Sequence, residues 1–203
     1  EDLFELPANN RTIESARDLL PKRWAMQVLD KPELSSLVLD EKEWFDRADS
    51  LLANYFSLEN PQSFESTYRE LHLERTISDE IYLHGYVDRL DIAPTGEVRI
   101  VDYKTGKAPK PGWEEKSLFQ LRVYALLYWR NEGVLPRLLQ LLYLGDGKTI
   151  KSSPTEKELE ATERILRNIG DEILTAIDTD CLPTKKSRLC DWCSFKNICP
   201  AHN

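Results

Sequence analysis

Two neighbouring stretches of the sequence decide the fold: GYVDRLD at residues 85–91 and IVDYKTG at residues 100–106. Both are rich in the apolar, β-branched and aromatic residues of strands, and residues 93–96 between them have the pattern of a type I turn that ends in a left-handed glycine. We therefore expect an antiparallel hairpin in which Asp88 lies directly across from Asp102. Because the Cβ atoms of opposed residues start about 5 Å apart, both carboxylates can reach one hard cation.

A lysine shares one face of the predicted hairpin with this acidic pair. Lys104 follows Asp102 by two residues, which places both side chains on the same face of the strand, and the register sets Lys104 opposite Tyr86. Two carboxylates and an ammonium group on a half-buried sheet are costly unless a metal or a ligand uses them. The alternative is that the carboxylates form ordinary salt bridges with Arg89 and Lys104 on a solvated face.

The rest of the chain mixes helical and strand-like patterns, which predicts an α/β protein. The first sixty residues read as helical, with a capping pair at Asp40 and Glu43 and with Pro21 breaking the first helix. Strand patterns lie at 70–74, 81–92, 97–103 and 137–144, and helical patterns lie at 114–130 and from an N-cap at Ser153 onward. We expect the last helix to turn a row of apolar side chains to the core: Leu159, Ala161, Ile165, Ile169, Ile173 and Ile177.

Three parts of one structural domain are expected: a helical region at 1–60, a core at 61–179 and a cysteine-bearing tail at 180–203. The net charge of −8 argues against a protein that coats nucleic acid through bulk charge, yet residues 99–130 carry an excess of Lys and Arg.

No apolar run approaches the roughly 20 residues of a membrane-spanning helix, and no signal peptide is visible. We therefore expect a cytoplasmic protein with no membrane partner. The start at Glu1 rather than at a methionine indicates a fragment or a processed chain.

The two decisive stretches and QLRVY at residues 120–124 together resemble the PD-(D/E)XK nuclease superfamily, and within it the RecB-type exonucleases. The resemblance covers roughly residues 60–203 and implies a restriction-endonuclease-like core, with a central mixed sheet flanked by helices. It implies that Mg²⁺ or Mn²⁺ is bound by Asp88, by Asp102 and by the backbone carbonyl of Tyr103. Lys104 would orient or activate the attacking water and neutralise charge at the scissile phosphate.

The same resemblance gives roles to Gln120 and Tyr124, which lie one helical turn apart and would contact DNA or steady the site. For Tyr124, packing in the core is the alternative. One departure is important, because RecB-type exonucleases carry an upstream cysteine and a Gly-x-x-x-His motif whose histidine binds metal. Neither is present, so we expect that the chain begins after that motif. His84 shares strand parity with Asp88 and could approach the site, although a surface or core role is the alternative.

The tail carries a C-x2-C-x5-C pattern, which indicates metal more often than a disulfide in a cytosolic chain. Thiolates select zinc or an iron–sulfur cluster. The resemblance implies a structural [4Fe–4S] cluster on Cys190, Cys193 and Cys199, with the fourth ligand upstream. Cys181 is not at a position where the family has a ligand, and zinc or a set of reduced thiols are the alternatives.

The expected function is that of a metal-dependent DNA exonuclease in DNA repair or recombination, acting on single strands or ends, with a helicase as a partner. Two alternatives remain from other classes. One is a catalytically silent DNA-binding or scaffold module of a helicase–nuclease system. The other is a metal-dependent hydrolase of a different substrate, against which the basic residues at 99–130 speak.

Overall fold

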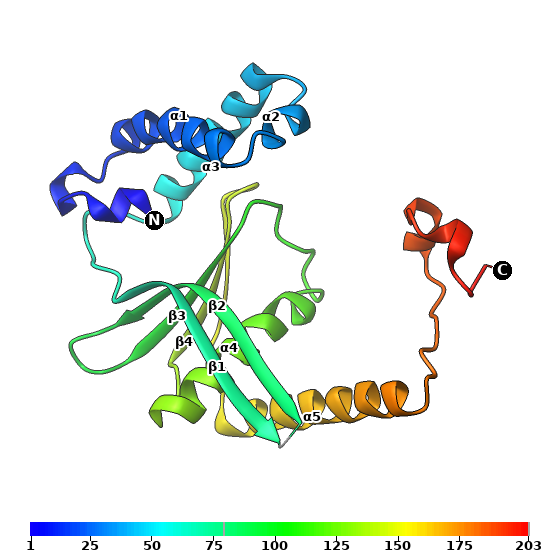
Figure 1. Ribbon diagram of the computed structural model, residues 1–203. Helices are drawn as coiled ribbons and strands as arrows, with labels where there is room; N and C mark the ends of the chain where they lie inside the picture. The colour runs from blue at the N-terminus through cyan, green and yellow to red at the C-terminus, as the bar shows by residue number, and fades with distance from the viewer. Residues whose placement is uncertain (79, 203) are drawn as a thin grey trace. The chain divides into compact units, whose positions relative to one another are not determined.

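The computed structural model describes residues 1–78 and 80–202 and contains one five-stranded mixed sheet (Figure 1). The strands follow one another in the sheet in chain order: β1 Tyr68–Ser78, β2 Ile81–Ile92, β3 Val98–Lys104, β4 Leu138–Tyr143 and β5 Lys148–Ser152. Neighbouring strands are antiparallel except β3 and β4, which are parallel. The predicted α/β class with a central mixed sheet and N-terminal helices is confirmed.

The predicted hairpin forms with the predicted register over its first four pairs, from Ile92 opposite Val98 to Arg89 opposite Val101. Its turn is closed because the N–H of Gly96 donates to the carbonyl of Ala93 over 2.8 Å, with Gly96 at φ +87°. The ladder between β2 and β3 ends at Arg89, immediately before Asp88. The expected pairings of Asp88 with Asp102 and of Tyr86 with Lys104 are therefore not part of the ladder, and Tyr86 pairs with His72 of β1.

Helix α4 (Glu115–Glu132) connects the parallel strands β3 and β4 and packs against the sheet. A crossover of this kind is required because parallel neighbours cannot be joined by a tight turn. The helix ends at Gly133, which adopts φ +71°. Fully buried aliphatic side chains of the helix and of the sheet form the core, among them Leu90, Ile100, Leu121, Ala125, Leu126, Leu127, Leu139 and Leu141, and Leu142 is buried on the opposite face of β4 from Leu141.

The N-terminal region contains α1 (Ile13–Asp30), α2 (Leu34–Leu37) and α3 (Glu41–Leu58), preceded by the short 3₁₀ helices η1 (Asp2–Glu5) and η2 (Ala8–Asn10). The carboxylate of Asp40 caps α3 by accepting from the N–H of Glu43 over 2.9 Å, as predicted. The prediction that Pro21 breaks the first helix is wrong, because α1 is continuous through it. Pro21 is exposed, so water can satisfy the carbonyl that loses its intrahelical partner.

A buried ion pair fastens the end of α3 to the sheet. The guanidinium of Arg89 is 1% exposed and lies 2.7 Å from the carboxylate of Glu59, which is 7% exposed. Burial by itself would lower the pKa of Arg89, but the hydrogen bonds that it donates to Glu59 and the charges nearby raise it overall. Arg89 also pairs with Asp91. Its recorded ion pairs are therefore with these two acids, and the expected alternative of an Arg89–Asp88 salt bridge is not what the structure forms.

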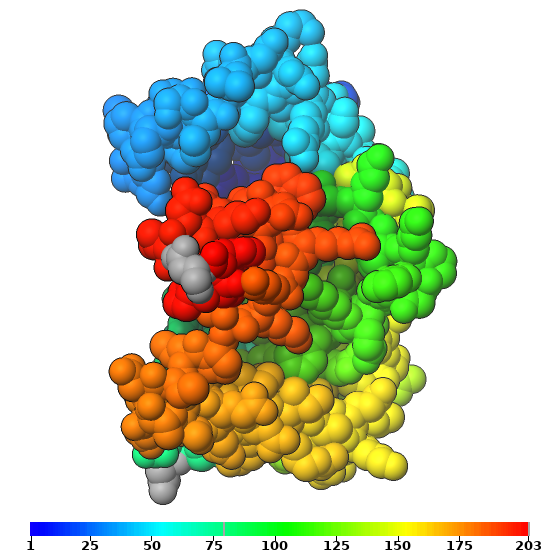
Figure 2. All heavy atoms as spheres, turned by 90° about the vertical axis from the view of Figure 1, so that its right-hand side faces the viewer, coloured from blue at the N-terminus to red at the C-terminus, as the bar shows by residue number. Residues whose placement is uncertain are grey.

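Helix α5 (Glu156–Asp178) differs from its prediction in two respects. Its cap is Thr155 rather than Ser153, because Thr155 and Glu158 form reciprocal hydrogen bonds. Leu159 is fully buried as predicted, but the four isoleucines after it are between 44% and 62% exposed. The expectation that these isoleucines face the core is therefore wrong. Figure 2 shows atoms of α5, coloured yellow to orange, at the surface.

Two compact units make up the chain, residues 1–163 and residues 164–203. The second unit contains most of α5 and the cysteine-bearing tail, whose regular structure consists of the 3₁₀ helices η3 (Arg188–Trp192) and η4 (Lys196–Ile198). No helix among the described residues is long and apolar enough to cross a membrane.

Candidate functional site

The candidate site lies at the end of β3, where Asp102 and Lys104 point to the same side of the strand. Asp102 is 2% exposed, and its Oδ2 lies 2.7 Å from Nζ of Lys104. Side chains two residues apart in a strand share a face, which is why the two groups meet. The Lys104 side chain is 32% exposed, so its ammonium group stays accessible from solvent.

Lys104 continues into a chain of hydrogen bonds on α4. Its Nζ donates to Oε1 of Gln120 over 2.9 Å, and Nε2 of Gln120 donates to the hydroxyl of Tyr124 over 2.7 Å. Residues four apart on a helix face the same way, so α4 presents both side chains to the end of β3. The structure thus brings together four of the residues that the sequence singled out.

Gly85 is a site residue that the sequence reasoning missed. A Cβ atom on Gly85 would lie 2.7 Å from Cε1 of Tyr124, which is closer than van der Waals contact allows. The aromatic ring therefore fills the space that a side chain on β2 would take. A glycine inside a strand pattern is a signal for such a close approach, and it was visible in the first residue of the decisive stretch.

Asp88 joins the site through the backbone of β3. Its side chain is half-buried, and its Oδ2 accepts a hydrogen bond from the N–H of Tyr103 over 2.8 Å. This contact replaces the next rung of the ladder and holds the carboxylate against β3, next to the residue that follows Asp102. Two carboxylates from adjacent strands are therefore held near one another where β2 and β3 separate.

The side chain of Tyr103 takes no part in this cluster. Its hydroxyl accepts a hydrogen bond from Arg89, and its ring packs edge-on against Tyr55 with centroids 5.9 Å apart. Burial raises the pKa of Tyr103 above its ordinary value, and burial likewise raises the pKa of Tyr55 to about 12. Both phenols are therefore neutral at physiological pH, and only the backbone carbonyl of Tyr103 remains as the predicted ligand.

The environment of Asp102 fits a divalent cation. Burial raises its pKa above the ordinary value and the charge of Asp88 raises it further, although Lys104 acts in the opposite direction. Its buried Oδ2 has no partner in hydrogen-bond geometry within the part of the chain that the structure describes. The ion pair with Nζ of Lys104 at 2.7 Å uses only part of what a carboxylate oxygen can accept, and carboxylate oxygens are the ligands that Mg²⁺ and Mn²⁺ prefer. The donor set therefore fits the ion that the fold family implies.

His84 shares strand parity with Asp88, which suggested that it could approach the candidate cation site, but its contacts lie elsewhere. Its ring lies 5.7 Å from the ring of His72 and 5.7 Å from that of Tyr82, on an exposed surface of β1 and β2. Its neighbours are therefore aromatic side chains rather than the candidate cation site.

The tail cysteines do not form a ligand set. All four cysteines are free thiols, and Cys190 accepts a hydrogen bond from the N–H of Ser187 over 3.3 Å. Over residues 1–78 and 80–202, no group of three or more Cys, His, Asp or Glu side chains is gathered as metal ligands. The short helices η3 and η4 bury none of their residues, so packing does not draw the thiols together. As arranged here, the cysteines do not fit an iron–sulfur cluster.

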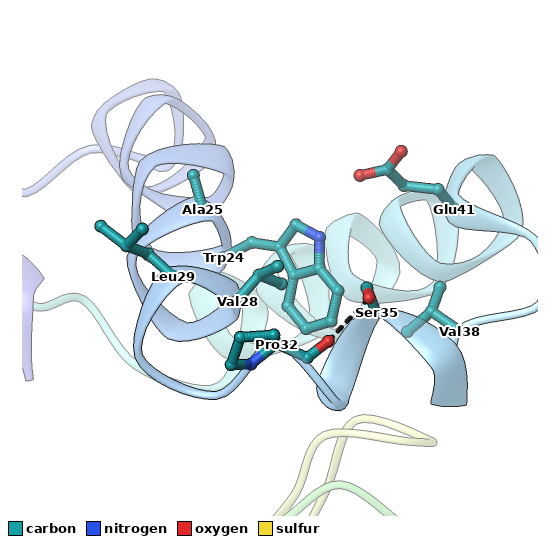
Figure 3. A pocket seen from close by; sticks show the side chains of 8 residues that line it. All are labelled: Trp24, Ala25, Val28, Leu29, Pro32, Ser35, Val38 and Glu41. Carbon is teal, nitrogen blue, oxygen red and sulfur yellow. Dashed lines mark hydrogen bonds between the residues drawn. The ribbon is translucent and has the colours of Figure 1, made fainter.

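A separate pocket of about 520 Å³ lies among the N-terminal helices. Figure 3 shows the indole of Trp24 at its centre, with the hydroxyl of Ser35 donating to the carbonyl of Pro32 over 2.7 Å. Its lining comes from α1, α2 and the segments beside them and includes none of the residues singled out above. The pocket is therefore distinct from the candidate site.

Comparisons with known proteins place the chain in a family. No curated protein matches the sequence. A solved structure of a candidate exonuclease from Eubacterium rectale aligns over 89% of this chain and 71% of its own, with a TM-score of 0.55 and 13% identity. That of a protein named SSO0001 aligns over 89% of this chain and 81% of its own, with a TM-score of 0.47 and 17% identity. The first of these likenesses shows a shared fold.

The family model of the PD-(D/E)XK nuclease superfamily matches residues 1–200, and the chain therefore belongs to that superfamily.

Proposed function

We propose that this protein is a Mg²⁺- or Mn²⁺-dependent DNA exonuclease of the RecB type, which acts on single strands or ends during DNA repair or recombination. A helicase is the expected partner, because an enzyme that acts on single strands needs duplex DNA to be unwound first. The observation that carries the proposal is the continuous contact from Asp102 through Lys104 and Gln120 to Tyr124, with Asp88 beside it. Membership of a nuclease superfamily supports a nucleic acid as the substrate.

The two carboxylates and the carbonyl of Tyr103 would hold the cation. When bound, a divalent ion polarises the scissile phosphoryl group and lowers the pKa of a coordinated water. Asp102 is suited to this task because it is buried and lies near the second carboxylate, Asp88. Asp88 is suited because the N–H of Tyr103 fixes the direction of its carboxylate.

Lys104 supplies a positive charge that the protein holds in place before substrate arrives. Its ammonium group can orient the attacking water or stabilise charge that develops on the phosphate. Such a group is effective only where its position is maintained, and Gln120 maintains it by accepting from Nζ. Tyr124 in turn holds Gln120, and Gly85 leaves the space that Tyr124 needs. Gln120, Tyr124 and Gly85 are thus positioning residues.

The proposal is tested with 5′- and 3′-labelled oligonucleotides, single- and double-stranded, incubated with Mn²⁺. We expect the wild type to release short products and the variants Asp102→Asn and Lys104→Ala to release none. Lys151→Ala is the matched control, because Lys151 is an exposed lysine on β5 outside the site. Full activity in both site variants would overturn the proposal. A wild type that binds the strands without cutting them would favour a silent DNA-binding module.

The iron–sulfur assignment of the tail rests on the spacing of Cys190, Cys193 and Cys199 alone. A cluster there would be structural, since ligation of a metal supplies folding free energy to a segment that buries little of itself. Metal analysis and a visible absorption spectrum of anaerobically purified protein test it. Iron with an iron–sulfur absorption band supports the assignment, whereas zinc alone or no metal contradicts it.

A further inference from the structure

The loop between β3 and α4, residues 105–114, can be followed in Figure 1, and it carries an exposed tryptophan. Trp113 is 75% exposed. Indole rings are normally buried or engaged at interfaces, because leaving so much apolar area in water forgoes hydrophobic stabilisation. We call residues 105–114 the Trp113 loop. One end of this loop follows Lys104 directly, and the other leads within six residues to Gln120.

The position of Trp113 is set by a turn with the sequence Lys110-Pro111-Gly112-Trp113. The N–H of Trp113 donates to the carbonyl of Lys110 over 3.0 Å, and Gly112 has φ +87°. Proline at the second position and a glycine of positive φ at the third are the requirements of a type II turn. The N–H of Gly112 also donates to the carboxylate of Glu114 over 2.7 Å. The indole is therefore presented on a formed turn.

The other half of the Trp113 loop is fastened to the turn between β4 and β5. The N–H of Ala108 donates to Oδ1 of Asp146 over 3.0 Å, and this hydrogen bond is the main reason that the pKa of Asp146 lies below its ordinary value. A loop held at both ends loses little conformational entropy when a ligand binds to it. This arrangement suits a binding surface.

The charges around Trp113 are complementary to a nucleic acid. Lys107 and Lys110 are exposed on the same loop. Of the two acids that follow, Glu114 accepts from Gly112, and Glu115 is paired with Arg122 at 2.5 Å. Lysines interleaved with an exposed aromatic ring are the common means by which proteins hold single strands, through phosphate contacts and base stacking.

We infer that Trp113 stacks on a nucleobase of the substrate strand while Lys107 and Lys110 contact its phosphates, so that the Trp113 loop holds single-stranded DNA beside Lys104. This inference rests on the proposed function and adds the element that holds the strand. Base stacking does not depend on sequence, which agrees with an enzyme that degrades strands of any sequence.

The test measures the Kd of a fluorescently labelled single-stranded oligonucleotide, in EDTA so that no strand is cut. From the usual contribution of one stacked base, Trp113→Ala should weaken binding about 5- to 150-fold, and Trp113→Phe should retain most of the affinity. Tyr82→Ala is the matched control. Tyr82 is 54% exposed, but its hydroxyl donates to Glu74 and its ring lies 5.7 Å from that of His84, so it is an exposed aromatic ring that is already engaged outside the Trp113 loop.

A second oligonucleotide, with abasic sites along its length, distinguishes stacking from a structural role. Without bases to stack on, the wild type and Trp113→Ala should bind it with similar affinity. An equal loss of affinity for both oligonucleotides, or no loss for either, would overturn the inference. If the wild type cuts and binds the strand while Trp113→Ala binds as well, only the inference fails. If the wild type neither cuts nor binds, the proposed function fails with it.

Discussion

Replacing Asp102 by asparagine should make the metal-free protein more stable, although the substitution removes a residue of the proposed site. The wild-type residue is 2% exposed and lies near Asp88, and the ion pair with Lys104 offsets only part of the cost of burying its charge. Its pKa is raised in the folded state by burial. The folded protein therefore binds a proton more tightly than the unfolded chain, and ionised Asp102 lowers the free energy of unfolding at neutral pH.

The magnitude follows from the cost of burying the carboxylate beside a second one. Desolvating a buried polar group costs about 1–3 kcal/mol, and asparagine recovers only part of it because the ion pair with Lys104 is lost. A gain of about 1 kcal/mol corresponds to an increase in Tm of roughly 2–4 °C for a chain of this size. The gain should be present above the raised pKa of Asp102 and should disappear in acid, where the wild-type carboxyl group is already protonated.

Thermal unfolding in EDTA and in excess Mn²⁺ provides the assay. Mn²⁺ at a hundred times its Kd should stabilise the wild type by about 2.7 kcal/mol and the variant by much less, so the order of the two Tm values should reverse. Asp146→Asn is a control, because the pKa of Asp146 is lowered rather than raised and its substitution should destabilise under both conditions. A wild type that is more stable than Asp102→Asn in EDTA at neutral pH would refute the reasoning.

Three further predictions concern the surroundings of the site. Gly85→Ala places a Cβ 2.7 Å from Tyr124, so overpacking should cost about 1–3 kcal/mol in unfolding free energy and nuclease turnover should fall; unchanged stability and turnover would contradict the close approach. Glu59→Gln leaves the buried guanidinium of Arg89 with one carboxylate fewer and should cost about 3–5 kcal/mol by urea unfolding, whereas a loss below 1 kcal/mol would show that the pair is not essential. Cys193→Ser should leave the Tm and DNA binding unchanged, because the tail thiols are free and are not gathered as metal ligands among the described residues; a loss of bound iron together with a lower Tm would contradict this arrangement and support the iron–sulfur assignment.

The hairpin and the site around it could be predicted because their signals are local. The turn at residues 93–96 and the alternation on each side fix the register of β2 and β3 up to Arg89, and Asp88 then approaches Asp102 through its hydrogen bond with the N–H of Tyr103. The spacing of Gln120 and Tyr124 by one helical turn likewise determines that both face the same way. The end of the ladder at Arg89 was not predicted, because it depends on how β2 leaves β3 to follow β1.

Other features depended on contacts that a sequence pattern does not specify. The pattern of α5 predicts an apolar face, but it does not say what covers that face, and its isoleucines are exposed. Strand β5 was missed because it is short, although the turn residues Gly145-Asp146-Gly147 directly before it were a signal for a hairpin. The pairing of Arg89 with Glu59 joins residues thirty positions apart, and no local rule connects them.

Diffraction from a crystal of the protein soaked in Mn²⁺ tests the central claim most directly, since the anomalous signal of manganese locates the ion without assumptions about its ligands. The account predicts a peak between the carboxylates of Asp88 and Asp102, within coordination distance of the carbonyl of Tyr103, and no peak there in Asp102→Asn. A wild-type crystal that binds manganese elsewhere, or binds none at this position, would contradict the account.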